Sequence, residues 1–172
     1  MGYRFETMAA DIDEKAIRDH DPEKLTLLLA HAKADALLPL VRKESVLITS
    51  DQVVVCGGTI LEKPENESEA RRHLQGYARS PAVTITAVVV TNTSTRRRLE
   101  GVDMAKVVFR TIPSFVIEKL IGSGTILRNA GAFSIEDPLL KNYIVRIEGE
   151  PESVMGLPAE MTRRLINEVR DG

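Results

Sequence analysis

Four charged side chains in this 172-residue sequence have the types and spacing that phosphate chemistry requires. Asp51 interrupts the β-branched run 46–55, where a carboxylate is costly to bury unless it is paired or bound to a metal. Lys63 places a cation after the next turn. Glu14 supplies a second carboxylate, and Lys33 supplies a second cation. The acids could hold a divalent cation and prepare a water molecule, while the lysines neutralise phosphate charge.

Each of these positions also has a structural interpretation. Glu14 stands beside Asp11 and Asp13, and from this motif alone such a group is more typical of a solvated acidic turn before a helix than of a cation site. Lys33 lies at the edge of an apolar helical stripe, where lysines commonly spread their stem over apolar surface and keep the ammonium in water. Asp51 could mark the solvated break between two β-runs of an ordinary hairpin. The residues alone leave both interpretations open.

The elements that must position these side chains are short, and capping and turn residues mark where several of them begin or end. Asp21 as an N-cap and Pro22 as the first helical residue predict a helix whose apolar residues recur to position 40, with Lys33 on it. Gly57 and Gly58 are expected to turn the chain between two strands. The remaining pattern predicts strands over 3–9, 46–48, 53–56, 82–90, 99–109 and 143–147, and helices after Asn66, over 113–121 and after Pro158. This order indicates one α/β domain, residues 1–172, with a mixed, twisted sheet.

Composition excludes several classes of protein. The net charge is −2 and the pI about 6.0, so no overall positive field favours nucleic acid or an anionic membrane. The basic run 96–98 is expected at a solvated hairpin tip, because the chain has 4% aromatic residues and no Trp to interleave with it. One cysteine, Cys56, rules out an intramolecular disulfide. Without a signal peptide or an apolar span, we expect a cytoplasmic protein that contacts no membrane.

Seven segments, in order along essentially the whole chain, resemble the motifs of the Maf family of nucleotide pyrophosphatases, also called septum-formation-inhibitor-like proteins. They are ADIDEK (10–15), LLLAHAKADAL (27–37), ITSDQVVV (48–55), ILEKP (60–64), KVVFRTIP (106–113), NAGAFSIED (129–137) and VMGLP (154–158). The resemblance implies an elongated α/β fold with a mixed, highly twisted sheet flanked by helices, related to inosine triphosphate pyrophosphatases. It also implies hydrolysis of a nucleoside triphosphate to the monophosphate and pyrophosphate with Mg²⁺ or Mn²⁺.

The resemblance gives the four charged residues specific roles. Asp51 would be the catalytic base or a metal ligand at the α-phosphate, and Glu14 would support the metal. Lys33 and Lys63 would bind the phosphates. The reaction would remove non-canonical nucleotides from the cell, and the family suggests a homodimer.

Two further residues are expected to contact the substrate. The Ser-Asp-Gln at 50–52, which contains Gln52, resembles the branch of the family that acts on 7-methylguanosine triphosphate, whereas the dTTP and UTP branch carries Ala-Asp-Thr. Glu136 falls where many relatives carry glutamine near the site. We therefore expect a modified or non-standard purine nucleotide as the substrate.

One expectation concerns the N-terminus. Family members begin with a strand, a Ser-x-Ser-x-x-Arg phosphate loop and a helix, and this chain starts at Met1 where the family would be leaving that helix. We therefore expect that element to be absent. The alternative function is then a catalytically impaired protein that binds nucleotide or another partner.

Overall fold

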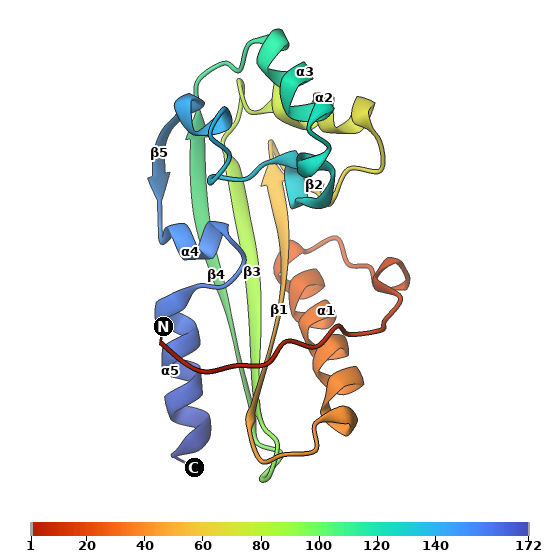
Figure 1. Ribbon diagram of the computed structural model, residues 1–172, viewed down its shortest axis with the longest axis vertical. Coiled ribbons are helices and arrows are strands. Elements are labelled where there is room, and N and C mark those ends of the chain that lie inside the picture. The colour runs from red at the N-terminus through yellow and green to blue at the C-terminus, as the bar shows by residue number, and fades with distance from the viewer. Residues whose placement is uncertain (1, 172) are drawn as a thin grey trace. The chain divides into compact units, whose positions relative to one another are not determined.

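The computed structural model describes residues 2–171 and contains a five-stranded sheet with helices around it. The strand order is β2-β1-β3-β4-β5 (Figure 1). The strands are β1 (Val46–Cys56), β2 (Thr59–Leu61), β3 (Ala82–Asn92), β4 (Arg98–Phe109) and β5 (Ile144–Glu148). The helices are α1 (Pro22–Leu37), α2 (Glu67–Gly76), α3 (Ser114–Gly122), α4 (Pro151–Val154) and α5 (Ala159–Arg170), with 3-10 turns η1 (Glu14–Ala16), η2 (Leu38–Leu40), η3 (Thr125–Arg128), η4 (Ala130–Ala132) and η5 (Leu140–Tyr143).

The α/β class, with a sheet flanked by helices, is confirmed. The sheet is antiparallel where the sequence analysis expected mixed directions, because tight turns join neighbouring strands: β2 returns along β1, and β4 returns after β3. Gly57 and Gly58 form the first of these turns with φ of 57° and 81°, and Cys56 pairs with Thr59 across it. A two-residue hairpin with both φ values positive favours glycine, as the sequence predicted.

The chain divides into two compact units. Unit 1 comprises the described residues of Met1–Asp51, Thr86–Asp103 and Gly156–Gly172, and unit 2 comprises Gln52–Ile85 and Met104–Met155. The expectation of a single domain over 1–172 stays a prediction.

In unit 1, α1 and α5 cover opposite faces of the strands (Figure 1). Ala87 and Val89 of β3 pack against Ala30 and Ala34 of α1. Val88 and Val90 point to the other face and pack against residues of α5, because successive side chains of a strand alternate between faces. The main contributors from α5 are Leu165, Ile166 and Val169. The alanines of α1 let that helix approach the sheet closely.

Unit 2 holds the larger apolar cluster, to which α2, α3 and the two outer strands contribute. At its centre Tyr77 stacks on Phe109 with ring centroids 5.2 Å apart, and Phe133 meets both rings edge-on. Arg71 of α2 and Glu118 of α3 form a two-pronged ion pair at 2.7 Å for both prongs. Aromatic edge contacts and a bidentate ion pair both fix the orientation of the elements that carry them.

Two expectations about the chain's segments have different outcomes. The strand predicted over 3–9 is wrong, because those residues are exposed and have no regular structure. The N-capped helices at Asp21 and Asn66 are confirmed, and each cap side chain accepts from backbone N–H groups of its own helix. Within residues 2–171, none of the helices has the length and apolar content needed to cross a bilayer.

Candidate functional site

Three of the charged residues singled out in the sequence meet in unit 1. The Nζ atom of Lys33 lies 2.5 Å from Oδ1 of Asp51 and 2.9 Å from Oε1 of Glu14. Asp51 and Lys33 are largely buried, with side chains 11% and 19% exposed, whereas the Glu14 side chain is 45% exposed. One ammonium therefore bridges two carboxylates, one inside the protein and one at its surface.

The local folding of three elements brings these side chains together. Glu14 begins η1, whose preceding Asp13 carboxylate accepts from the backbone N–H of Lys15 at 3.1 Å. Lys33 lies in the fourth turn of α1, and Asp51 in the middle of β1. Two residues before Asp51, the buried Thr49 hydroxyl donates to the α1 carbonyl of Ala30 at 2.8 Å, which ties the strand to the helix one turn from Lys33.

The electrostatics of this cluster favour the charged form of Lys33. Burial by itself lowers the pKa of the ammonium, but hydrogen bonds and charge attraction from Asp51 and Glu14 more than reverse this, so its pKa is raised. Lys33 is therefore fully protonated at neutral pH. One ammonium does not balance two carboxylates, so the cluster would need a further cation to bind a polyanion such as a triphosphate.

A divalent cation is compatible with the donor set of the cluster. Glu14 and Asp51 direct carboxylate oxygens to one point, the Lys33 ammonium, and Mg²⁺ is commonly held by one or two carboxylates together with substrate phosphates and water. Residues 2–171 contain no group of three or more His, Cys, Asp or Glu arranged to hold a metal ion alone. The chain would therefore depend on the substrate to complete a metal site.

The residues next to Asp51 on β1 face elsewhere. The Ser50 hydroxyl lies 2.9 Å from the carbonyl oxygen of Ala87 and 2.8 Å from that of Gly156, all in unit 1. In unit 2, the Gln52 amide donates to the carbonyl of Ser153 at 2.7 Å. Both side chains thus form hydrogen bonds with backbone carbonyl groups. The contact of Gln52 with substrate stays a prediction.

Lys63 and Glu136 lie in unit 2, and both are exposed. Lys63 follows β2, and the carbonyl of the preceding Glu62 accepts from the backbone N–H of Gly131 at 3.0 Å. The Gly131 carbonyl in turn accepts from the buried Tyr77 hydroxyl at 2.6 Å. The two sequence segments that carry Lys63 and Glu136 are therefore fastened together, and the roles of these two residues toward substrate stay predictions.

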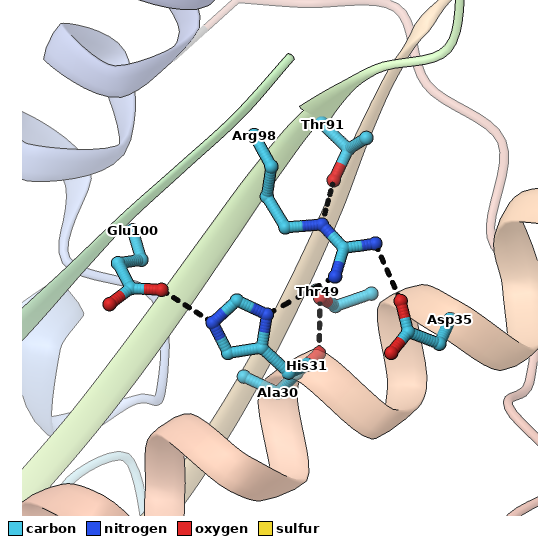
Figure 2. A network of polar contacts seen from close by, with 7 residues as sticks. All are labelled: Ala30, His31, Asp35, Thr49, Thr91, Arg98 and Glu100. Carbon is cyan, nitrogen blue, oxygen red and sulfur yellow. Dashed lines mark hydrogen bonds and ion pairs between the residues drawn. The ribbon is translucent and has the colours of Figure 1, made fainter. Parts of the chain in front are cut away.

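The sequence analysis missed a second polar cluster in unit 1, built around Arg98 (Figure 2). Arg98 was assigned to a solvated hairpin tip, but it is the first residue of β4 and its side chain is 23% exposed. It contacts His31 and Asp35, which are four residues apart on α1. That i, i+4 spacing of two hydrogen-bond acceptors is a local signal, but only the fold reveals the arginine that meets them.

Comparisons with known proteins agree with this architecture. The family model described as "Maf-like protein" matches residues 1–169. The chain is 46% identical to a protein of Dictyostelium discoideum named "7-methyl-GTP pyrophosphatase", over 98% of this chain and 88% of that protein. It is 33% identical to a "dTTP/UTP pyrophosphatase" of Vibrio vulnificus strain YJ016, over 98% and 89%, and 33% identical to a "Nucleoside triphosphate pyrophosphatase" of Synechococcus sp. strain JA-3-3Ab, over 96% and 83%.

Proposed function

Because the chain belongs to the Maf family, we propose that it is a nucleoside triphosphate pyrophosphatase, a hydrolase of nucleotide phosphoanhydride bonds. The observation that carries the proposal is the cluster of Glu14, Lys33 and Asp51. In it the largely buried Asp51 carboxylate contacts the Lys33 ammonium, whose pKa is raised. A carboxylate can take a proton from water, and an ammonium can neutralise phosphate charge. Both groups can take part in the hydrolysis of a triphosphate.

The reaction consumes one water molecule. Its oxygen forms a bond to the α-phosphorus, and the bond from that phosphorus to the oxygen bridging to the β-phosphorus breaks, which gives the nucleoside monophosphate and pyrophosphate. Asp51 accepts a proton from the attacking water, and the Lys33 ammonium stabilises charge on the phosphates. A divalent cation, Mg²⁺ or Mn²⁺, held by Glu14 and Asp51 would neutralise further phosphate charge.

We propose 7-methylguanosine triphosphate as the preferred substrate. The similarity to the Dictyostelium protein supports this choice, because it is higher than the similarity to the dTTP/UTP and general relatives given above. The Ser-Asp-Gln at 50–52 supports it as well, since that motif resembles the branch acting on this nucleotide. The cytoplasmic location and the homodimer stay predictions from the sequence.

The test is pyrophosphate release from 7-methylguanosine triphosphate, GTP, ITP, CTP, UTP and dTTP, each with Mg²⁺ and with Mn²⁺. We expect the highest kcat/KM for the methylated nucleotide. A preference for dTTP and UTP would retain the reaction and overturn the substrate. No release from any nucleotide by folded protein would overturn the enzymatic function, and nucleotide binding measured by calorimetry would then assign a binding role.

A further inference from the structure

The Arg98 side chain joins three elements of unit 1. Its Nη2 atom donates to Oδ1 of Asp35 at 2.7 Å, its Nε atom donates to the Thr91 hydroxyl at 3.2 Å, and its Nη1 atom lies 3.2 Å from Nδ1 of His31 (Figure 2). His31 and Asp35 belong to α1, Thr91 to β3 and Arg98 to β4. One guanidinium therefore fastens the helix to two strands.

The geometry assigns the tautomer of His31. A guanidinium has donors and no acceptor, so the Nδ1 atom that faces Arg98 must be the unprotonated acceptor. The ring proton is then on Nε2, which donates to the Glu100 carboxylate (Figure 2). His31 thus accepts from one β4 residue and donates to another, and this fixes the ring on the strand.

These contacts lie on the opposite flank of α1 from Lys33. Ala30 and Ala34 form the line along which the helix rests on β3. At 100° per residue, Lys33 is displaced to one side of that line, whereas His31 and Asp35 are displaced to the other side. Lys33 accordingly meets Asp51 on β1, while the other two residues meet β4, the neighbour of β3 on the far side.

Along this line the packing between α1 and β3 is shallow, and the larger buried side chains of α1, which are Leu25, Leu29 and Leu37, lie outside it. Ala30 and Ala34 have single methyl groups, which do not interlock deeply with Ala87 and Val89. A rotation of α1 by about 20° would move a side-chain atom about 6 Å from the axis by roughly 2 Å. Such a displacement is large for a catalytic group, because misplacement by about 1 Å can cost about 100-fold in rate.

We propose that Arg98 is a positioning residue: by holding His31 and Asp35 it fixes the rotation of α1 and thereby the location of Lys33 beside Asp51. Its effect on catalysis rests on the proposed function of the cluster, whereas its effect on the place of the Lys33 ammonium does not. Arg98 itself need not touch the nucleotide.

The first test measures the surroundings of Lys33 without any substrate. Through-space NMR contacts between the Lys33 side chain and Asp51 are compared in the wild-type protein, in R98M and in R97M, which removes the exposed arginine next in sequence. We expect these contacts to weaken in R98M and to persist in R97M. Unchanged contacts in folded R98M would overturn the proposal.

A second variant covers the case in which R98M does not fold. D35N replaces an exposed carboxylate by an amide of the same shape and weakens one of the two holds on α1. We expect the contacts between Lys33 and Asp51 to weaken less than in R98M, and unchanged contacts would count against the proposal. NMR of the ring nitrogens should also show the Nε2-protonated form of His31, and an Nδ1-protonated form would contradict the Arg98 contact.

Kinetics then tests the consequence for the reaction. With the nucleotide that the wild-type protein hydrolyses best, we expect R98M to lower kcat by about 10- to 100-fold with a smaller change in KM, and R98K to recover part of the loss. Equal kcat in R98M and R97M, despite weakened contacts between Lys33 and Asp51, would overturn the effect on catalysis and retain the positioning role. If the wild-type protein hydrolyses no nucleotide, the NMR result still decides the positioning role.

Discussion

Lys33 and Asp51 form an ion pair, 2.5 Å from Nζ to Oδ1, in which both side chains are largely buried. Glu14 extends the pair toward the surface, so the exposure of the three charged side chains falls from Glu14 through Lys33 to Asp51. A buried pair of this kind costs desolvation energy that a surface pair does not. Hydrogen bonds and charge attraction from the two carboxylates offset this cost for the Lys33 ammonium, whose pKa is raised, so the pair is a preassembled site that also contributes to stability.

The first prediction concerns Asp51. D51N keeps the shape of the side chain but removes its charge and its ability to accept a proton from water. We expect kcat for pyrophosphate release to fall by about 100- to 10,000-fold while the circular dichroism spectrum is retained. D171N, which changes an exposed aspartate at the end of α5, should keep wild-type turnover. Unchanged turnover in D51N would remove Asp51 from the mechanism.

The second prediction follows from the raised pKa of Lys33. Because the folded protein binds this proton more tightly than the unfolded chain, Lys33 stabilises the fold at neutral pH and this contribution is lost as the pH rises through the folded-state value, above about 10.5. Chemical denaturation from pH 8 upward should show the stability of wild type and K33M converging at alkaline pH. K24M, which removes an exposed lysine of the same helix, should run parallel to wild type. Parallel curves for K33M would refute the stabilising role.

The third prediction concerns the Gly131 junction that holds the Lys63 loop. Gly131 has φ of +65°, and an added Cβ would lie 2.9 Å from Cβ of Val54. G131A should therefore lower the free energy of unfolding by about 2–4 kcal/mol. G122A is the matched control, since nothing lies within 4 Å of a Cβ at the end of α3 and its backbone is not left-handed. Equal unfolding midpoints in urea for the two variants would contradict the close packing at Gly131.

The fourth prediction concerns His73 of α2. Burial lowers the pKa of this imidazole, which the nearby Glu69 only partly offsets, and within residues 2–171 its buried Nδ1 has no hydrogen-bond partner. The unfolded chain therefore binds a proton at His73 more tightly than the folded protein does. The free energy of unfolding should fall as the pH drops below about 6.5. H73Q should flatten this part of the pH profile in thermal unfolding, whereas H20Q, at an exposed histidine, should leave it unchanged. A profile for H73Q as steep as that of wild type would exclude His73 as the cause.

Much of the fold could be predicted because its signals are local. Asp21 and Pro22 place the start of α1, and Gly57 and Gly58 place the first hairpin, since capping and positive φ depend on a few adjacent residues. The strand expected over 3–9 is wrong for the complementary reason: a short segment forms a strand only where a neighbouring strand can bond to it.

The candidate site was only partly predictable. Asp51, Lys33 and Glu14 could be chosen because charged residues beside apolar runs are conspicuous, but their mutual contact depends on how α1 lies on the sheet. Arg98 was misassigned because an arginine triplet at a turn has the same sequence pattern whether its last member faces water or a helix. Long-range pairs of this kind leave no periodic trace in a single sequence.

The alternation of Thr49, Ser50 and Asp51 along β1 restricts how the gene for this protein can change. Thr49 and Asp51 face α1, while Ser50 faces the backbone of Gly156 on the other side. Loss or gain of a single codon in β1 just before Thr49 would turn all three side chains to the wrong face. Length variation in a family of such proteins should therefore be concentrated in loops, and this strand should tolerate point changes far better than insertions or deletions.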